Sequence, residues 1–177
     1  MPDLTLRIKK KNDGSAALSC IRADGTTTWQ QQNGATGRFF PLHDLTHLAV
    51  ETTLGFRRAF YGLVSEGWDI STFSSPTAVA KLPPEALLAE LIVGLLDVER
   101  ATGERSDADD FNWKIQAYFR NKDVPPPGFQ ISDEQLASIR ARRAELFTQW
   151  NAVAEGGTLD VSFTRPSAPD TNGPHHP

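Results

Sequence analysis

The stretch LTLRIKKKNDGSAALSCI, residues 4–21, decides the architecture of the amino-terminal part of the chain. Apolar and polar residues alternate over residues 4–9, which is the period of a strand with one buried face. A second alternating segment covers residues 16–21, and Asn12-Asp13-Gly14 between the two segments is a turn signal. The stretch therefore predicts an antiparallel hairpin.

Two further segments extend this hairpin into a sheet. Asp24-Gly25 precedes Thr26–Gln30, which predicts a third strand in a meander. Near the other end of the chain, Gly156-Gly157 precedes Thr158–Phe163, where apolar and polar residues alternate again. We expect this late strand to close the same sheet.

The residues between these strands have helical periodicity. Pro41 suits a first helical turn because its missing N–H would be unpaired there anyway. Ser132 and Gln135 match a capping box, in which the serine oxygen accepts one N–H bond and the glutamine returns another. We expect four helices: about 42–66, about 84–101, one capped by Ser106 with Asp109, and about 132–154.

The order of these elements predicts an α+β fold. It is a mostly antiparallel sheet of three N-terminal strands plus a C-terminal strand, covered by about four helices. We expect a single domain over residues 1–165. Residues 166–177 are polar and proline-rich and have no periodicity, which predicts a disordered tail.

The composition narrows the possible functions. The chain has 177 residues and a formal net charge of −4, which argues against nonspecific binding to nucleic acid or anionic lipid. The single cysteine, Cys20, excludes an intrachain disulfide, and its strand-like setting predicts a small buried thiol. No secretory signal and no apolar run of bilayer length is present, so we expect a soluble cytoplasmic protein without a membrane partner.

The block PLHDLTHLAVE, residues 41–51, carries the candidate chemistry. His43, His47 and Glu51 stand at i, i+4 and i+8, so on a helix their side chains fall within roughly 80° of arc. Asp44 lies at the edge of this polar stripe. Two imidazoles and a carboxylate are ligands for Zn²⁺, Fe²⁺ or Mn²⁺, and they leave coordination positions open for water or substrate.

The same stripe has two other interpretations. Most amphipathic helices carry a charged outer face, and histidines spaced four residues from acids can be ordinary surface pairs. The chain would then be a non-enzymatic interaction module whose stripe is solvated. A third interpretation makes the histidines metal-free general acids or bases, because their charge changes near neutral pH.

The segment His43-Asp44-Leu45-Thr46-His47 resembles the H-E-x-x-H motif of the zincin metalloproteases. That resemblance implies two zinc ligands one turn apart with Asp44 as the general base. Asp44 is shorter than the glutamate of the motif by roughly one bond, which draws the carboxylate back from a metal-bound water and disfavours proteolysis. The fuller block, PLHDLTH-x-AVE, is also similar to small uncharacterised bacterial proteins, which implies no established reaction.

Two charged residues lie where the later helices require apolar side chains. Glu99 falls on the apolar face of the helix over 84–101, and Arg143 falls on that of the helix over 132–154. A buried charge needs a partner, so we expect Glu99 and Arg143 to pair with each other or with the histidine stripe. Glu99 is then a candidate further ligand or base, and Arg143 a candidate holder of an anionic substrate or a carboxylate. A frayed last turn for Glu99 and a snorkelling Arg143 are the plainer alternatives.

Together these features predict a divalent-metal-binding protein, with metal-assisted hydrolysis as the reaction class if it is an enzyme. His43, His47 and Glu51 would hold the ion, Asp44 would accept a proton from its water, and Arg58 or Arg143 would steady negative charge. No nucleotide or flavin signature is present in the sequence. The expected partner is a small molecule or a protein, and a homo-oligomer is compatible with the dispersed tryptophans.

Overall fold

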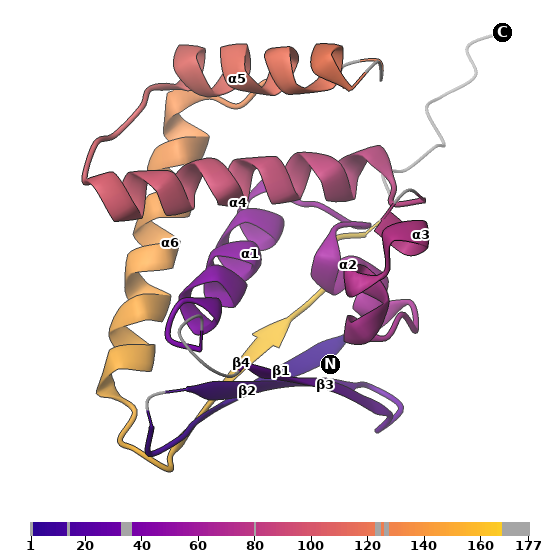
Figure 1. Cartoon of the computed structure of the whole chain (residues 1–177), viewed down its shortest axis with the longest axis vertical. Coiled ribbons are helices and arrows are strands. Elements are labelled where there is room, and N and C mark those ends of the chain that lie inside the picture. Colours follow the sequence, from indigo (N-terminus) through magenta and orange to yellow (C-terminus); the bar gives the residue numbers. More distant parts are fainter. Residues whose placement is uncertain are drawn as a thin grey trace, which may run out of the picture.

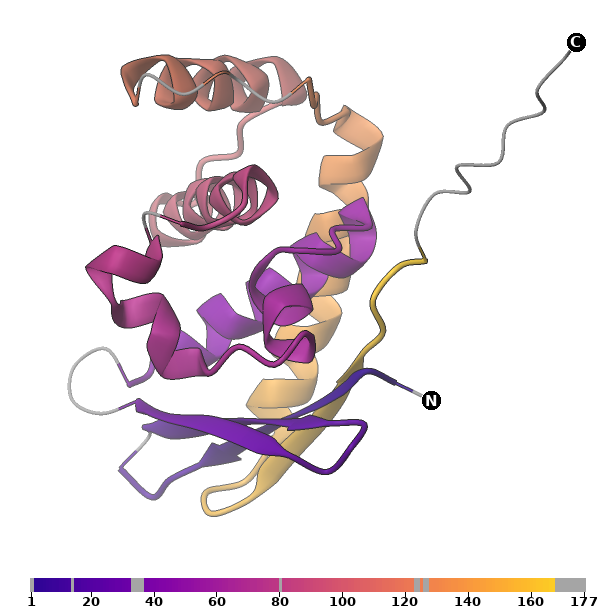
Figure 2. The same ribbon diagram turned by 90° about the vertical axis from the view of Figure 1, so that its right-hand side faces the viewer.

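The computed structural model describes residues 2–13, 15–32, 37–79, 81–122, 125 and 128–167. Helices cover one face of a four-stranded antiparallel sheet whose strand order is β3-β2-β1-β4 (Figures 1 and 2). The strands are β1 (Leu4–Lys10), β2 (Ala16–Arg22), β3 (Thr27–Gln32) and β4 (Thr158–Phe163). The predicted α+β fold is confirmed, including the late strand beside β1. Of the predicted tail, residues 168–177 lie outside the described part of the chain.

Residue alternation decides which face of the sheet is covered. Leu6 of β1 pairs with Cys20 of β2 and with Val161 of β4, and both Leu6 and Cys20 are fully buried beneath the helices. On the opposite face, Arg7 donates hydrogen bonds of 2.9 and 2.7 Å to the carboxylate of Asp160. A register slip of one residue would turn the apolar row towards solvent, so the pattern fixes the register.

The helices form layers above the sheet (Figures 1 and 2). The helix α1 packs against both α4 and α6, while α6 runs alongside and leads into β4. Two of the predicted helices are confirmed with small changes at their ends, and the Ser132–Gln135 capping box is present. The helices are α1 (Phe40–Leu54), α2 (Phe60–Ser65), the short 3₁₀ helix η2 (Ile70–Ser74), α3 (Pro76–Val79), α4 (Pro84–Thr102), α5 (Ala108–Asn121) and α6 (Asp133–Ala152).

The predicted continuous helix over residues 42–66 is wrong, because the first helix ends at Leu54. Gly55 adopts a left-handed conformation with φ of +70° and donates its N–H to the carbonyl of Glu51, which ends α1. The helix α2 then begins in a new direction at Phe60. The elements η2 and α3, which follow α2, were not predicted from the sequence.

The cap of α5 differs from the prediction by one position. Asp107, rather than Ser106 or Asp109, accepts the hydrogen bond from the N–H of Asp110 at the start of this helix. The buried apolar residues of the sheet and the helices form one continuous cluster. Within the described residues, none of the helices combines the length and the apolar character that crossing a bilayer requires.

Candidate metal centre

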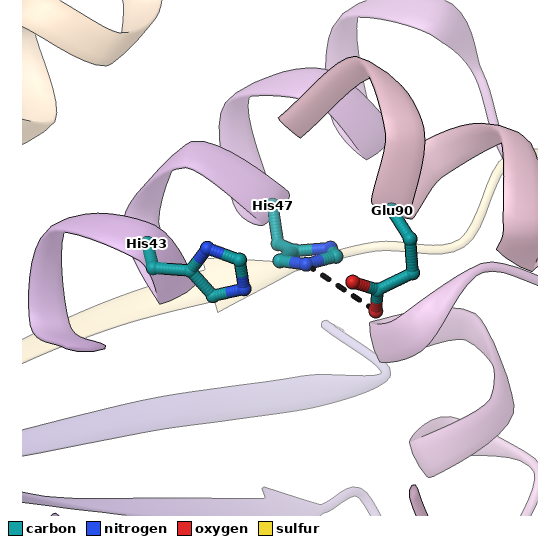
Figure 3. Close-up of side chains that lie close together, drawn as sticks. All are labelled: His43, His47 and Glu90. Atoms are coloured by element: carbon teal, nitrogen blue, oxygen red, sulfur yellow. Dashed lines mark ion pairs between the residues drawn. The ribbon is translucent and has the colours of Figure 1, made fainter. Parts of the chain in front are cut away.

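The candidate centre lies where α1 meets α4 (Figure 3). His43 and His47 project from successive turns of α1, and their ring centroids are 4.8 Å apart. Glu90 reaches towards both rings from α4. One potential ligand atom from each of these three residues lies within 4.8 Å of the others, which is close enough for all three to hold one metal ion.

Glu90 lies at the open side of this cluster. Nε2 of His47 is 3.5 Å from Oε1 of Glu90, and the His47 side chain is only 3% exposed whereas that of Glu90 is 45% exposed. The imidazole therefore forms the inner wall of the centre, and the carboxylate forms its rim. An ion or a small molecule can reach the cluster from that rim.

His43 is oriented by a second carboxylate of α4. Its Nδ1 lies 2.7 Å from Oδ2 of Asp97, and Nε of Arg100 lies 3.3 Å from the other oxygen of Asp97. Burial alone would raise the pKa of Asp97, but its hydrogen bond and charge interaction with His43 hold the pKa below its ordinary value. An ionised carboxylate only accepts, so Nδ1 of His43 donates to Asp97, and Nε2 is the ring nitrogen that this carboxylate does not engage.

His47 has a comparable carboxylate behind it. Its Nδ1 is 3.4 Å from Oε1 of Glu51, four residues later on α1, although the angles are too poor for a hydrogen bond. The other oxygen of Glu51 accepts hydrogen bonds of 2.9 and 3.4 Å from the N–H groups of Tyr61 and Gly62. Glu51 thus lies behind the ring and also satisfies two N–H groups in the first turn of α2.

The carboxylates decide the protonation of His47. Burial lowers the pKa of His47, but Glu90 and Glu51 outweigh burial and raise that pKa to about 10. Burial has the opposite effect on the Glu51 carboxyl and raises its pKa, although its interactions with His47 act to lower it. Burial would raise the pKa of the Glu90 carboxyl, but the charge of His47 outweighs burial and lowers that pKa. Without a metal, therefore, the His47 ring is protonated on both nitrogens and positively charged near neutral pH.

A small pocket of about 210 Å³ opens beside the centre. His43, Asp44, His47 and Glu90 contribute to its lining, so Asp44 faces the same space as the candidate ligands. His47, Asp44 and Glu51 are 3%, 6% and 0% exposed. The interpretation of the stripe as a solvated helix face is therefore wrong, because α4 and the α2–η2 segment cover it.

Two of the predicted ligands have other partners. Glu51 lies behind His47 and binds backbone N–H groups of α2, as described above. Glu99 is buried on α4, as its position predicted, but it pairs with Arg140 and accepts the N–H of Ser106. It lies roughly 13 Å beyond Glu90 along the helix axis, because each helical residue rises 1.5 Å. The structure does not bring Glu99 to the histidines.

The two arginines expected at the site also lie elsewhere. Arg58 pairs with Glu66 at 3.3 Å, and both are at least partly exposed. Arg143 donates a 2.7 Å hydrogen bond to the carbonyl of Leu96 and stacks over the ring of Phe147. Neither arginine lines the pocket beside the histidines. The predicted partnership of Arg143 with Glu99 is likewise corrected, because Arg140 takes that place one turn earlier on α6.

Sequence reasoning missed Glu90 and Asp97, the two carboxylates of α4 that complete the centre. They are seven residues apart, which places them on one face of α4 two turns apart. That spacing was a usable signal. Glu99 stands out in the sequence because it interrupts an apolar face, whereas a polar residue at the border of such a face is ordinary.

Comparisons with descriptions of known protein families, with curated proteins and with solved structures find no match to this chain.

Proposed function

We propose that this protein binds a divalent metal ion through His43, His47 and Glu90 and uses it for the hydrolysis of a small molecule. One observation carries the proposal: each histidine has a carboxylate near Nδ1. Asp97 is hydrogen-bonded to His43 at 2.7 Å, and Glu51 lies 3.4 Å from His47 without a hydrogen bond. Metal-ligating histidines nearly always have such a partner on the nitrogen that does not bind the metal. Two histidines on a solvated helix face would not require such a carboxylate partner.

The three ligands suit a catalytic ion better than a structural one. Structural zinc sites are closed by four protein ligands, whereas catalytic sites keep a position for water or substrate. Two imidazoles and one carboxylate are compatible with Zn²⁺, Fe²⁺ or Mn²⁺. Because Glu90 forms an exposed rim and a pocket adjoins the rings, the remaining positions would face that pocket.

Residues of the pocket supply the other functions that hydrolysis needs. A bound divalent ion lowers the pKa of its water and polarises an oxygen of the substrate. Asp44 lines the same space and would accept the proton released by that water. Arg58 and Arg143 have no part in this proposal, because they lie outside the pocket.

Elemental analysis tests the metal centre. Protein made without an affinity tag is stripped of metal, reconstituted with zinc, iron(II) or manganese(II), and freed of excess ion by gel filtration. We expect one ion per chain in the wild type. His47→Ala and Glu90→Gln should lose the ion, and Asp97→Asn should weaken its binding about 10–100-fold.

Two control variants separate the centre from other metal-binding groups. His175→Ala/His176→Ala removes two imidazoles outside the described residues and should keep the ion. Glu99→Gln should also keep it, because Glu99 pairs with Arg140 on another part of α4. A wild type that holds no ion after reconstitution, or a Glu90→Gln variant that binds metal as tightly as the wild type, would contradict the proposal.

A further inference from the structure

We infer that the pocket beside the metal centre takes an uncharged small molecule with a compact aromatic or apolar body and one metal-binding group. The inference rests on the proposed function and adds the class of substrate. It follows from the size of the pocket, the side chains of its wall, its charge and its polar groups.

The pocket limits the ligand to a small molecule. Its volume is about 210 Å³, below the roughly 300–1,000 Å³ of pockets that enclose drug-sized ligands. His47 and Ile70, which are 3% and 1% exposed, lie at its bottom, and the exposed residues Ser74 and Glu90 lie at its mouth. A single ring with a short polar group matches this space, whereas a peptide or a nucleotide exceeds it.

The wall next to the metal ligands is aromatic. Phe40, Phe60 and Phe73 line the pocket, and the ring centroids of Phe60 and Phe73 are 4.7 Å apart. Phe60 also contacts the His47 ring, with centroids 5.5 Å apart. An apolar body that enters the pocket therefore meets these rings while its polar group reaches the ion. Burial of apolar surface against them favours such a ligand.

The charge of the lining disfavours anions. Two carboxylates, Asp44 and Glu90, line the pocket, and among the described lining residues there is neither lysine nor arginine. These two carboxylates offset the two positive charges of a divalent ion, and Asp97 and Glu51 lie behind the histidines. The loaded centre therefore has no excess positive charge that would attract an anion. The anionic substrate expected from Arg143 is replaced by an uncharged one, because Arg143 binds the carbonyl of Leu96 instead.

Two polar side chains lie on the side formed by β3 and η2. Gln30 and Ser74 both line the pocket. An amide and a hydroxyl can each donate and accept a hydrogen bond. They are suited to hold a second polar atom of the ligand at the end that faces away from the ion.

The test compares three probes on the cobalt(II) form of the full chain, in the His175→Ala/His176→Ala background. Imidazole, 4-phenylimidazole and phenylphosphonate are titrated, and the visible spectrum of cobalt reports binding. We expect 4-phenylimidazole to bind about tenfold or more tightly than imidazole, because its phenyl ring is buried. It should also bind more tightly than phenylphosphonate, which has the same ring but an anionic group.

A pair of variants locates the selectivity. Phe73→Ala should reduce the preference for 4-phenylimidazole, because it removes one ring from the wall. Phe147→Ala is the matched control: it truncates another half-buried phenylalanine, which stacks on Arg143 away from the pocket. That control should keep the preference of the parent protein. If Phe73→Ala does not fold, the comparison of the three probes on the parent protein decides the question by itself.

The outcomes separate the two proposals. Stoichiometric cobalt with equal affinity for imidazole and 4-phenylimidazole, or with phenylphosphonate bound at least as tightly as 4-phenylimidazole, would overturn the substrate class and leave the metal centre standing. Failure to take up cobalt would overturn the proposed function, and the inference would fall with it.

Discussion

A carboxylate faces each ring nitrogen of His47, Glu51 at Nδ1 and Glu90 at Nε2. Two carboxylates on either side of one ring favour positive charge on that ring, because each of them attracts it. In the metal-free protein the charge is a proton on His47, whose pKa is raised to about 10. A divalent metal ion at Nε2 would supply positive charge in place of that proton. The proton and the metal ion therefore compete for Nε2 of His47.

This competition predicts a pH dependence of metal binding. A raised pKa means that protonated His47 stabilises the metal-free fold below its ordinary pKa of 6.5, and that this stabilisation is lost as the pH rises through about 10. Within that window the ion must displace one proton. We expect the apparent Kd for zinc to fall about tenfold per pH unit between about pH 7 and pH 9.

Calorimetric titration in two buffers of different ionisation enthalpy measures the proton release directly. About one proton per bound ion should come from His47 in this range. The variant His175→Ala/His176→Ala should release the same number, because it leaves the centre intact. An affinity that does not change between these pH values would show that the ion does not bind at His47.

The break between α1 and α2 sets the position of Glu51. Gly55 ends α1, and the next turn brings the N–H groups of Tyr61 and Gly62 onto the Glu51 carboxylate. The apolar periodicity continues through this break, since Ala49, Phe56 and Leu63 are all buried. Because the periodicity is continuous, it could not predict that two helices bury these residues.

Gly62 allows this close connection. A Cβ atom on Gly62 would overlap with the backbone carbonyl of Arg57, which has no freedom to withdraw as a flexible side chain would. We expect Gly62→Ala to lower the free energy of unfolding by about 1–3 kcal/mol, as overpacking does in other proteins. Urea denaturation of the metal-free protein measures this change.

Gly94→Ala is the matched control for this substitution. Gly94 lies inside α4 with no atom near the position of its missing Cβ, so alanine there should stabilise the helix by about 0.5–1 kcal/mol. The two variants thus shift stability in opposite directions. A Gly62→Ala variant as stable as the wild type would mean that the turn after Gly55 accommodates a side chain.

The metal ligands come from two helices that different parts of the fold hold in place. The helix α1 lies against α6 and α4 above the sheet, and Glu90 belongs to α4. An ion shared by α1 and α4 would therefore bind the folded chain and not the unfolded one. Ligands that bind only the folded state stabilise it by mass action.

We accordingly expect the thermal midpoint to rise with metal concentration. At a free ion concentration about 100-fold above Kd, the gain is about 2.7 kcal/mol, which for a chain of this size raises Tm by about 5–10 °C. Scanning calorimetry at a series of zinc concentrations measures the shift. His43→Ala/His47→Ala should show none, and an equal shift in that variant would place the ion elsewhere in the molecule.

The sequence alone determined the four-stranded sheet, most of the long helices and the pairing of His43 with His47. These features depend on residues that are close in the chain, where the periods of strands and helices and the chemistry of turns act directly. Hairpin strands find their register by the same alternation that buries Leu6 and Cys20.

Only the tertiary structure decided which carboxylates meet the histidines. Glu90 and Asp97 lie far along the chain from the two histidines. These carboxylates meet the histidines because α4 packs against α1 with the face that carries both carboxylates turned towards α1. That crossing results from the packing of the whole apolar cluster, so no local pattern encodes it. The local pattern favoured Glu51 and Glu99 as ligands. Instead, Glu51 accepts hydrogen bonds from the backbone of α2 and Glu99 forms an ion pair with Arg140, because these groups are their neighbours in space.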